Sequence, residues 1–207
     1  MADLILYTDS NFSSPYAMSV YVTLVEKGLA FDLKTVDLDA GEHQRPPFRD
    51  LGLTGRVPTL VHGALVLNES SAIVEYLEDV FPAPAHAAVL PLDPSKRALA
   101  RQVQAWVRSD LMPIRSERST AVIFAGPTDK PLSDTAQAAA ARLIRIAERM
   151  VDGPHLFGQW SIADTDLALM LNRLIMNDDP VPQRLKDYAG AQWQRPSVQQ
   201  WMALPRP

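Results

Sequence analysis

The 207-residue sequence contains no cysteine. This excludes disulfide scaffolds, thiolate metal sites and any mechanism in which the protein supplies its own sulfur nucleophile. Any thiol chemistry must therefore use a thiol that a substrate brings. Histidine is also scarce, and no two histidines lie three or four residues apart, the spacing that puts two ligands on one helical face. We expect no metal site built by the protein. The histidines are His43, His62, His86 and His155.

Excess charge and long apolar runs are missing as well. The formal net charge is -4, and no block of lysine and arginine offers the counterion release that drives nucleic-acid binding. Apolar runs such as residues 4–7 fall far short of the roughly 20 residues that span a bilayer. The N-terminus lacks the basic and apolar regions of a signal peptide. We expect no nucleic-acid or membrane partner and a cytoplasmic location.

Apolar residues make up 47% of the sequence, which is enough for a core. The first eighty residues alternate between strand-like and helix-like patterns. The expected elements are strand 4–8, helix 15–27, strand 31–36, the hairpin 59–62 and 65–67, and helix 70–81. A helix that crosses between two strands implies that strands 4–8 and 31–36 are parallel. The pattern predicts β-α-β followed by β-β-α.

Composition changes after this half. Residues 81–94 are rich in proline and form a candidate linker. Beyond it, Asp93 and Pro94 are typical of a helix start, and Pro113 should end or kink that helix. Residues 133–151 predict a second helix, and Ser161 with Asp164 has the spacing of a capping box. We expect domains at 1–82 and 94–207, joined by a linker at 83–93, with the second domain all-helical.

Three short segments lie at the ends of the predicted strands. They are residues 11–16 (NFSSPY), 56–60 (RVPTL) and 68–73 (NESSAI). With them, nearly the whole sequence resembles the glutathione S-transferases, including the helix start at residues 161–166 (SIADTD). The resemblance implies a thioredoxin-like α/β N-terminal domain followed by an all-α bundle. It is nearest to bacterial members of serine type that are tau- or theta-like, with Ser-Pro-Tyr placed as in the plant tau-like branch.

Ser14 has two interpretations. From the residues alone it is an N-cap, because its hydroxyl can accept a backbone N–H while Pro15 needs no donor. The resemblance implies that the same hydroxyl donates a hydrogen bond to the sulfur of glutathione and favours the thiolate, helped by the N-terminus of the helix. Ser13 is a competing hydroxyl. Tyr7 is a further alternative, since some transferases activate the thiol with a tyrosine near this position.

Other contacts to glutathione follow from the resemblance. It implies a cis bond between Val57 and Pro58 that turns the Val57 backbone toward the cysteinyl unit, although most X-Pro bonds are trans. It implies that Glu69 and Ser70 hold the γ-glutamyl end. From the local sequence alone, an acidic residue and a capping serine would simply stabilise the start of a helix. The remaining candidates, which could contact the glycine carboxylate or be ordinary surface, are His43, Gln44, Arg45 and Arg56.

Four arginines recur along what the sequence predicts to be one helix. They are Arg101, Arg108, Arg115 and Arg118. Such a stripe is usually a solvated face or a set of ion pairs between helices. The resemblance places the second substrate against this helix, where a basic wall could select anionic or peroxide-like substrates.

The function implied is a glutathione transferase that attacks an electrophile with the glutathione thiolate or reduces organic hydroperoxides. Glutathione would be the co-substrate, without a metal. A mixed-disulfide cycle is excluded by the lack of cysteine, and a zeta-type isomerase is disfavoured because its Ser-Ser-Cys signature is missing. A non-catalytic binding protein of the same fold is the alternative. The resemblance also implies a homodimer that buries residues 60–81 and the helix around Trp106.

Overall fold

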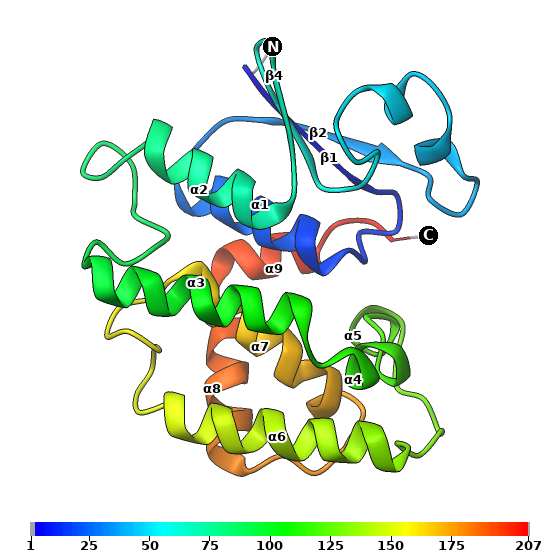
Figure 1. Cartoon of the computed structure of the whole chain (residues 1–207), viewed down its shortest axis with the longest axis vertical. Helices are drawn as coiled ribbons and strands as arrows, with labels where there is room; N and C mark the ends of the chain where they lie inside the picture. The colour runs from blue at the N-terminus through cyan, green and yellow to red at the C-terminus, as the bar shows by residue number, and fades with distance from the viewer. Residues whose placement is uncertain (1–2, 207) are drawn as a thin grey trace. The chain divides into compact units, whose positions relative to one another are not determined.

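The computed structural model describes residues 3–206, which divide into two compact units (Figure 1). One unit comprises the described residues of Met1–Val89 together with those of Pro196–Pro207, and the other comprises Leu90–Arg195. The last part of the chain thus groups with the first part. The boundaries expected from composition, 1–82 and 94–207 around a linker at 83–93, stay a prediction.

A four-stranded mixed sheet organises the first unit, in the order β2-β1-β3-β4. The central strand β1 pairs in parallel with β2 and antiparallel with β3, and β3 pairs antiparallel with β4. The structure therefore confirms both the parallel pair and the hairpin. The strands are β1 (Leu4–Asp9), β2 (Asp32–Val36), β3 (Thr59–His62) and β4 (Leu65–Asn68).

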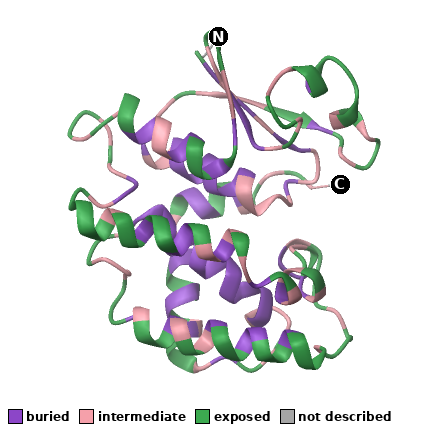
Figure 2. Ribbon diagram, viewed as in Figure 1, coloured by how far each residue is buried: buried purple, intermediate pink, exposed green. Residues whose placement is uncertain are grey.

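Helix α1 is the most buried helix of this unit, as Figure 2 shows. It contacts α2 and also α9, which comes from the far end of the chain. Trp201 of α9 is fully buried, with its ring centroid 5.7 Å from that of Phe12 and 5.3 Å from that of Tyr21. These ring contacts tie the last helix to the first. The helices are α1 (Pro15–Glu26), α2 (Ser70–Val80) and α9 (Pro196–Met202), with short 3-10 turns η1 (Glu42–Gln44) and η2 (Phe48–Asp50).

The second unit is helical throughout its described elements. Helix α7 is buried along nearly its whole length (Figure 2) and contacts α3, α5 and α8. Its start is fixed by Asp164, whose carboxylate accepts the Ser161 N–H at 2.8 Å and the Ser161 hydroxyl at 3.0 Å. Aspartate thus serves in the capping box. The helices are α3 (Pro94–Ser109), α4 (Met112–Glu117), α5 (Ala121–Phe124), α6 (Asp134–Met150), α7 (Ile162–Ile175) and α8 (Gln183–Trp193).

The break between α3 and α4 differs from the expectation. Helix α3 begins as predicted, with the Asp93 side chain accepting the Lys96 N–H at 2.8 Å. It ends before Pro113 is reached, because Leu111 adopts a left-handed conformation with φ 60°. Pro113 lies instead in the first turn of α4, where a missing N–H costs nothing. Among residues 3–206, every helix is too short or too polar to cross a membrane.

A buried ion pair holds α1, α2 and the following segment together. The Lys27 ammonium lies 2.7 Å from the Glu78 carboxylate, and both side chains are almost fully buried. Lys27 also donates to the backbone carbonyls of Phe81 at 2.8 Å and Ala87 at 3.1 Å. Glu78 accepts the Val89 N–H at 3.2 Å. Each charge is therefore matched by an opposite charge and by backbone groups.

We expect Glu78→Ala to lower the free energy of unfolding by about 3–5 kcal/mol, because the Lys27 ammonium would stay buried without its counter-charge. Urea unfolding followed by circular dichroism measures the change. The control is Asp79→Ala, an exposed carboxylate on the same helix, which should change stability by less than about 0.5 kcal/mol. A similar small effect for both variants would contradict a stabilising role for the pair.

Candidate functional site

The register of the sheet brings the predicted segments to one end of it. Tyr7 near the end of β1 pairs with Thr59 at the start of β3, and Thr59 pairs with Asn68 at the end of β4. The loop after β1, the segment before β3 and the turn after β4 therefore leave the sheet at the same edge. Since β2 runs parallel to β1, the segment after it also leaves from this end.

Ser14 caps helix α1. It has extended backbone angles, and its Oγ accepts the Ala17 N–H at 3.2 Å, while Pro15 occupies the first helical position. The residue is half-buried. Because Oγ acts as an acceptor in this cap, the hydroxyl hydrogen can still be donated to a ligand atom that lies just beyond the helix N-terminus.

The two alternatives to Ser14 make different contacts in the structure. The Ser13 hydroxyl donates to the Asp9 carboxylate at 2.8 Å, so its hydrogen points into the protein. The Tyr7 ring packs against Phe48 with centroids 5.5 Å apart, and the Lys34 ammonium lies 5.7 Å from the Tyr7 centroid. The bond to Asp9 favours Ser14 over Ser13 as the donor to an external ligand, whereas the Tyr7 contacts involve its ring and not its hydroxyl.

The Val57–Pro58 bond is cis, as the resemblance implied. Among the described residues, no backbone group pairs with the N–H or C=O of Val57. An extended peptide could therefore add here in the manner of an extra strand. The buried Asn68 side chain steadies the neighbouring loop: it accepts the Thr54 N–H at 3.2 Å and donates to Thr59 Oγ1 at 2.6 Å.

Glu69 has a positive φ, with backbone angles of φ 68° and ψ 111°, at the N-terminus of α2. Such a conformation in a residue other than glycine costs on the order of 1–3 kcal/mol and is commonest at functional sites. The Glu69 side chain is exposed, and Ser70 beside it is buried. The turn thus presents a carboxylate and the first N–H groups of a helix at the edge of the sheet where Ser14 lies.

The residues after β2 and before β3 that could contact the glycine carboxylate are mostly exposed. Gln44 is exposed, and its amide nitrogen lies 3.3 Å from Nε2 of the half-buried His43. Arg45 donates to the backbone carbonyls of Ala40 and Gly41, so its guanidinium stabilises its own loop. Arg56 is exposed at the segment that leads into β3.

Sequence reasoning missed Asp9. This carboxylate ends β1 and is 3% exposed, and it accepts hydrogen bonds from both Ser13 and Ser14. The signal in the sequence was an acidic residue at a strand end, a few residues before a Ser-Pro helix start. Elsewhere, within the described part of the chain, metal-ligating side chains nowhere gather in a group of three or more.

Comparison with known proteins agrees with this geometry. Residues 13–80 match the model of the glutathione S-transferase N-terminal domain, and residues 93–206 match that of the C-terminal domain. The chain belongs to the glutathione S-transferase family. It is 48% identical to a glutathione transferase homologue from Burkholderia GL BGR1 solved with bound glutathione. That likeness covers 96% of this chain and 95% of the other, with a TM-score of 0.81.

Curated relatives of this chain carry two kinds of name. A glutathione S-transferase of Hyoscyamus muticus is 30% identical over 78% of this chain and 79% of its own length. A maleylacetoacetate isomerase of Pseudomonas aeruginosa is 40% identical over 54% of this chain and 51% of its own length. The chain spans about half the length of the first curated relatives it matches.

The predicted arginine stripe is wrong as a feature of one helix. Arg101 and Arg108 lie on α3, whereas Arg115 lies on α4 and Arg118 just after it. Arg118 is 2% exposed and donates to the Asp179 carboxylate at 2.6 and 2.9 Å, a contact that raises the Arg118 pKa. Arg108 lies 3.0 Å from the Asp166 carboxylate of α7. At least two of these arginines thus serve ion pairing within the helical unit.

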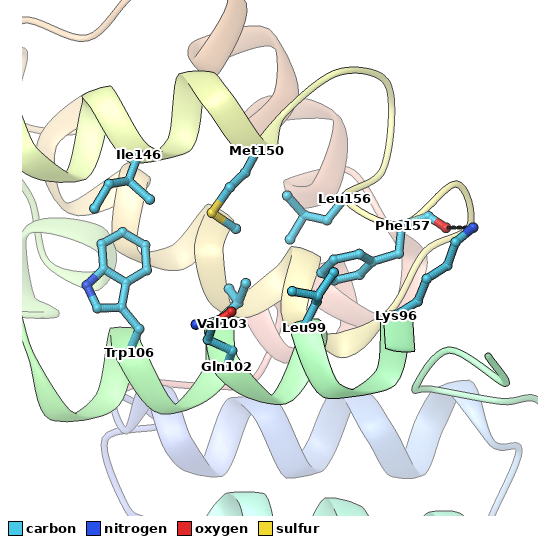
Figure 3. A pocket seen from close by; sticks show the side chains of 9 residues that line it. All are labelled: Lys96, Leu99, Gln102, Val103, Trp106, Ile146, Met150, Leu156 and Phe157. Atoms are coloured by element: carbon cyan, nitrogen blue, oxygen red, sulfur yellow. Dashed lines mark hydrogen bonds between the residues drawn. The ribbon is translucent and has the colours of Figure 1, made fainter. Parts of the chain in front are cut away.

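A hollow of about 730 Å³ lies in the helical unit between α3 and α6 (Figure 3). Its wall is mainly apolar, and Trp106 and Ile146 face each other across it. Lys96 closes one end, where its ammonium donates to the Phe157 carbonyl at 3.2 Å. The lining residues are Lys96, Leu99, Gln102, Val103, Trp106, Ile146, Met150, Leu156 and Phe157.

Proposed function

We propose that the chain is a glutathione transferase that ionises the thiol of glutathione at Ser14 and presents the thiolate to an electrophile. The observation that carries the proposal is the Ser14 hydroxyl. It caps α1 as an acceptor, keeps a hydrogen to donate, and lies at the edge of the sheet where Val57 and Glu69 also lie.

The energy required is within reach of this arrangement. A free thiol has a pKa of about 8.5, and lowering it by two units takes about 2.7 kcal/mol. A hydrogen bond to a charged acceptor contributes about 1.5–3 kcal/mol. A helix N-terminus adds about 0.3–1 kcal/mol. Ser14 and the N-terminus of α1 together therefore supply the preference for thiolate, while the thiol proton leaves to solvent.

The remaining candidates would hold the tripeptide in place. The Val57 N–H and C=O pair with the cysteinyl backbone. Ser70 and the first N–H groups of α2 hold the γ-glutamyl carboxylate, and Glu69 accepts from its ammonium. His43, Gln44 and Arg56 lie on segments that could contact the glycine carboxylate.

A second candidate activity is glutathione-dependent isomerisation. It is favoured by the maleylacetoacetate isomerase among the relatives, and it too requires only an activated glutathione thiol. These names favour a zeta-like grouping over the tau-like one expected from Ser-Pro-Tyr. Against an isomerase stands Pro15, which occupies the position of cysteine in the zeta Ser-Ser-Cys signature.

One panel distinguishes these activities. Purified protein with glutathione is assayed on an aryl halide, an organic hydroperoxide and maleylacetoacetate. Turnover of the aryl halide alone supports conjugation, while turnover of the hydroperoxide or of maleylacetoacetate would favour peroxide reduction or isomerisation. Retention on immobilised glutathione without turnover of any substrate, and without a thiolate absorbance, would instead favour the non-catalytic binding protein.

We expect Ser14→Ala to lower kcat about 100-fold or more, since it removes the donor to the sulfur. The apparent pKa of bound glutathione, measured by thiolate absorbance, should rise. The comparison variant is Ser13→Ala, which removes a hydroxyl that already donates to Asp9. Its kcat should fall less than about fivefold. If Ser13→Ala or Tyr7→Phe lost activity and Ser14→Ala kept it, the thiol-activating hydroxyl would be that of Ser13 or Tyr7 and not that of Ser14.

We expect Glu69→Ala and Ser70→Ala to raise the KM for glutathione about tenfold or more while changing kcat less than about threefold. The wild-type side chains bind the γ-glutamyl end of glutathione, where little changes while the sulfur attacks the electrophile. Initial rates at varied glutathione concentration give both constants. A loss confined to kcat, with normal KM, would show that these residues act at the reacting centre.

We also propose that two copies of the chain pair, with the hollow between α3 and α6 as part of the contact. Leu99 on its rim is 50% exposed and Trp106 is half-buried, so an apolar surface is open to solvent in one chain. Contiguous exposed apolar surface marks interaction sites. A two-fold pair covers the same patch on both partners, and it is the commonest oligomer symmetry.

We expect light scattering to give about twice the 22.9 kDa mass of one chain at micromolar concentration. Leu99→Asp should shift the mass toward one chain, because a charge would be buried in the contact. Leu92→Asp is the control, since Leu92 is 72% exposed and does not line the hollow. If the wild-type protein had the mass of one chain and still turned over glutathione fully, activity would not require a dimer.

A further inference from the structure

The Asp9 carboxylate collects four hydrogen bonds from its own neighbourhood. Its Oδ2 accepts the Ser13 N–H at 2.7 Å and the Ser13 hydroxyl at 2.8 Å. Its Oδ1 accepts the Ser14 N–H at 3.0 Å and the Thr8 hydroxyl at 3.1 Å. A carboxylate offers about four acceptor positions, so these donors fill it. Asp9 is therefore not free to bind a substrate or to accept the thiol proton.

These bonds fix both serines in different ways. The two backbone N–H groups cannot turn away, so their bonds to Asp9 set the path of the chain into the N-cap of α1. The Ser13 hydroxyl, by contrast, can rotate, and its bond to Oδ2 keeps its hydrogen inside the protein. Asp9 thus holds the backbone of both serines in position and also accepts the hydroxyl of Ser13.

Arg206 holds the same loop from the opposite end of the chain. Its guanidinium donates to the Phe12 carbonyl at 3.2 Å and to the carbonyls of Trp201 at 3.2 Å and Met202 at 2.8 Å. Burial lowers the Arg206 pKa, and the charge of Asp9 opposes this lowering. The negative charge beside the helix start therefore has a cation near it within the same unit.

We propose that Asp9 is a positioning residue for thiol activation: it fixes Ser14 at the N-cap of α1 and takes up the Ser13 hydroxyl, so that Ser14 alone donates to sulfur. The proposal rests on the proposed function, because it concerns the same thiol. It goes further by assigning a role to a carboxylate that contacts neither substrate nor reacting atom.

Two effects of Asp9 on the thiol have opposite signs, which makes the proposal testable. A negative charge near the sulfur disfavours thiolate, so loss of the charge alone would lower the thiol pKa. Loss of position would instead weaken the Ser14 hydrogen bond and raise that pKa. A misplacement of about 1 Å can cost about 100-fold in rate. Positioning should therefore outweigh charge.

The test compares Asp9→Asn with wild-type protein. An asparagine keeps the size of the side chain but sets an amide NH2 against one of the backbone N–H groups. We expect kcat to fall about 10- to 100-fold and the apparent pKa of bound glutathione to rise by about one unit, with KM changed less than about threefold. A lowered thiol pKa, or an unchanged kcat and pKa, would overturn the proposal.

A double variant separates positioning from general damage. In a Ser14→Ala background, Asp9→Asn should have little further effect on kcat and should no longer raise the thiol pKa, because the group it positions is gone and only the charge effect, which lowers that pKa, remains. A purely structural role would instead add its full loss to that of Ser14→Ala. The matched control is Asp39→Asn, which removes a carboxylate that accepts from Asn11 of the same loop and should leave both quantities unchanged.

Folding is checked by thermal unfolding and circular dichroism. If Asp9→Asn does not fold, Thr8→Val carries the test, since it removes one of the four donors to the carboxylate without changing the size of the side chain. It should raise the thiol pKa and lower kcat in the same direction by a smaller amount, and no change would overturn the proposal. Failure of the proposed function would be visible separately, as absent turnover in the wild type.

Discussion

The antiparallel pairing of β3 with the central strand β1 is the constraint on which the candidate site depends. It places the start of β3 beside the end of β1, and the hairpin then returns the end of β4 to the same edge. Were β3 reversed, Val57 would move by the length of that strand, about 13 Å for four residues. It could then not share a ligand with Ser14 and Glu69. Strand direction therefore decides which loops meet.

Buried carboxylates fix the loops that the sheet brings together, and others elsewhere in the fold. Asp9, Glu78 and Asp164 each accept backbone N–H groups from irregular segments outside the strands and helices. Glu78 takes the N–H of Val89, and Asp164 takes that of Leu156 at 2.8 Å. A buried N–H without a partner costs about 1–3 kcal/mol, and a charged acceptor binds it more strongly than a neutral one. The fold thus uses acids inside the protein to fix loops.

The features that could be predicted are those in which cause and effect lie close together in the sequence. Ser14 before Pro15 already indicates a helix start, and Ser161 with Asp164 indicates another. The Arg206 contact to Phe12 has no such signal, because its partners stand almost two hundred residues apart. The break of α3 was missed for another reason, since Leu111 adopts a left-handed backbone that sequence assigns to glycine or asparagine.

The relatives include both transferases and isomerases. Both names are compatible with a chain in which the groups that activate the thiol are separate from the groups that bind the second substrate. The groups that would activate a thiol lie at one sheet edge and are fixed by local bonds such as those of Asp9 to Ser13 and Ser14. Conjugation and isomerisation would both begin with the same thiolate, so the hydrogen bonds of Asp9 and Ser14 do not by themselves distinguish them. The distinction must come from groups that orient the second substrate. Such groups can change without disturbing the loop that Asp9 holds, and for that reason one activating site is compatible with several reactions.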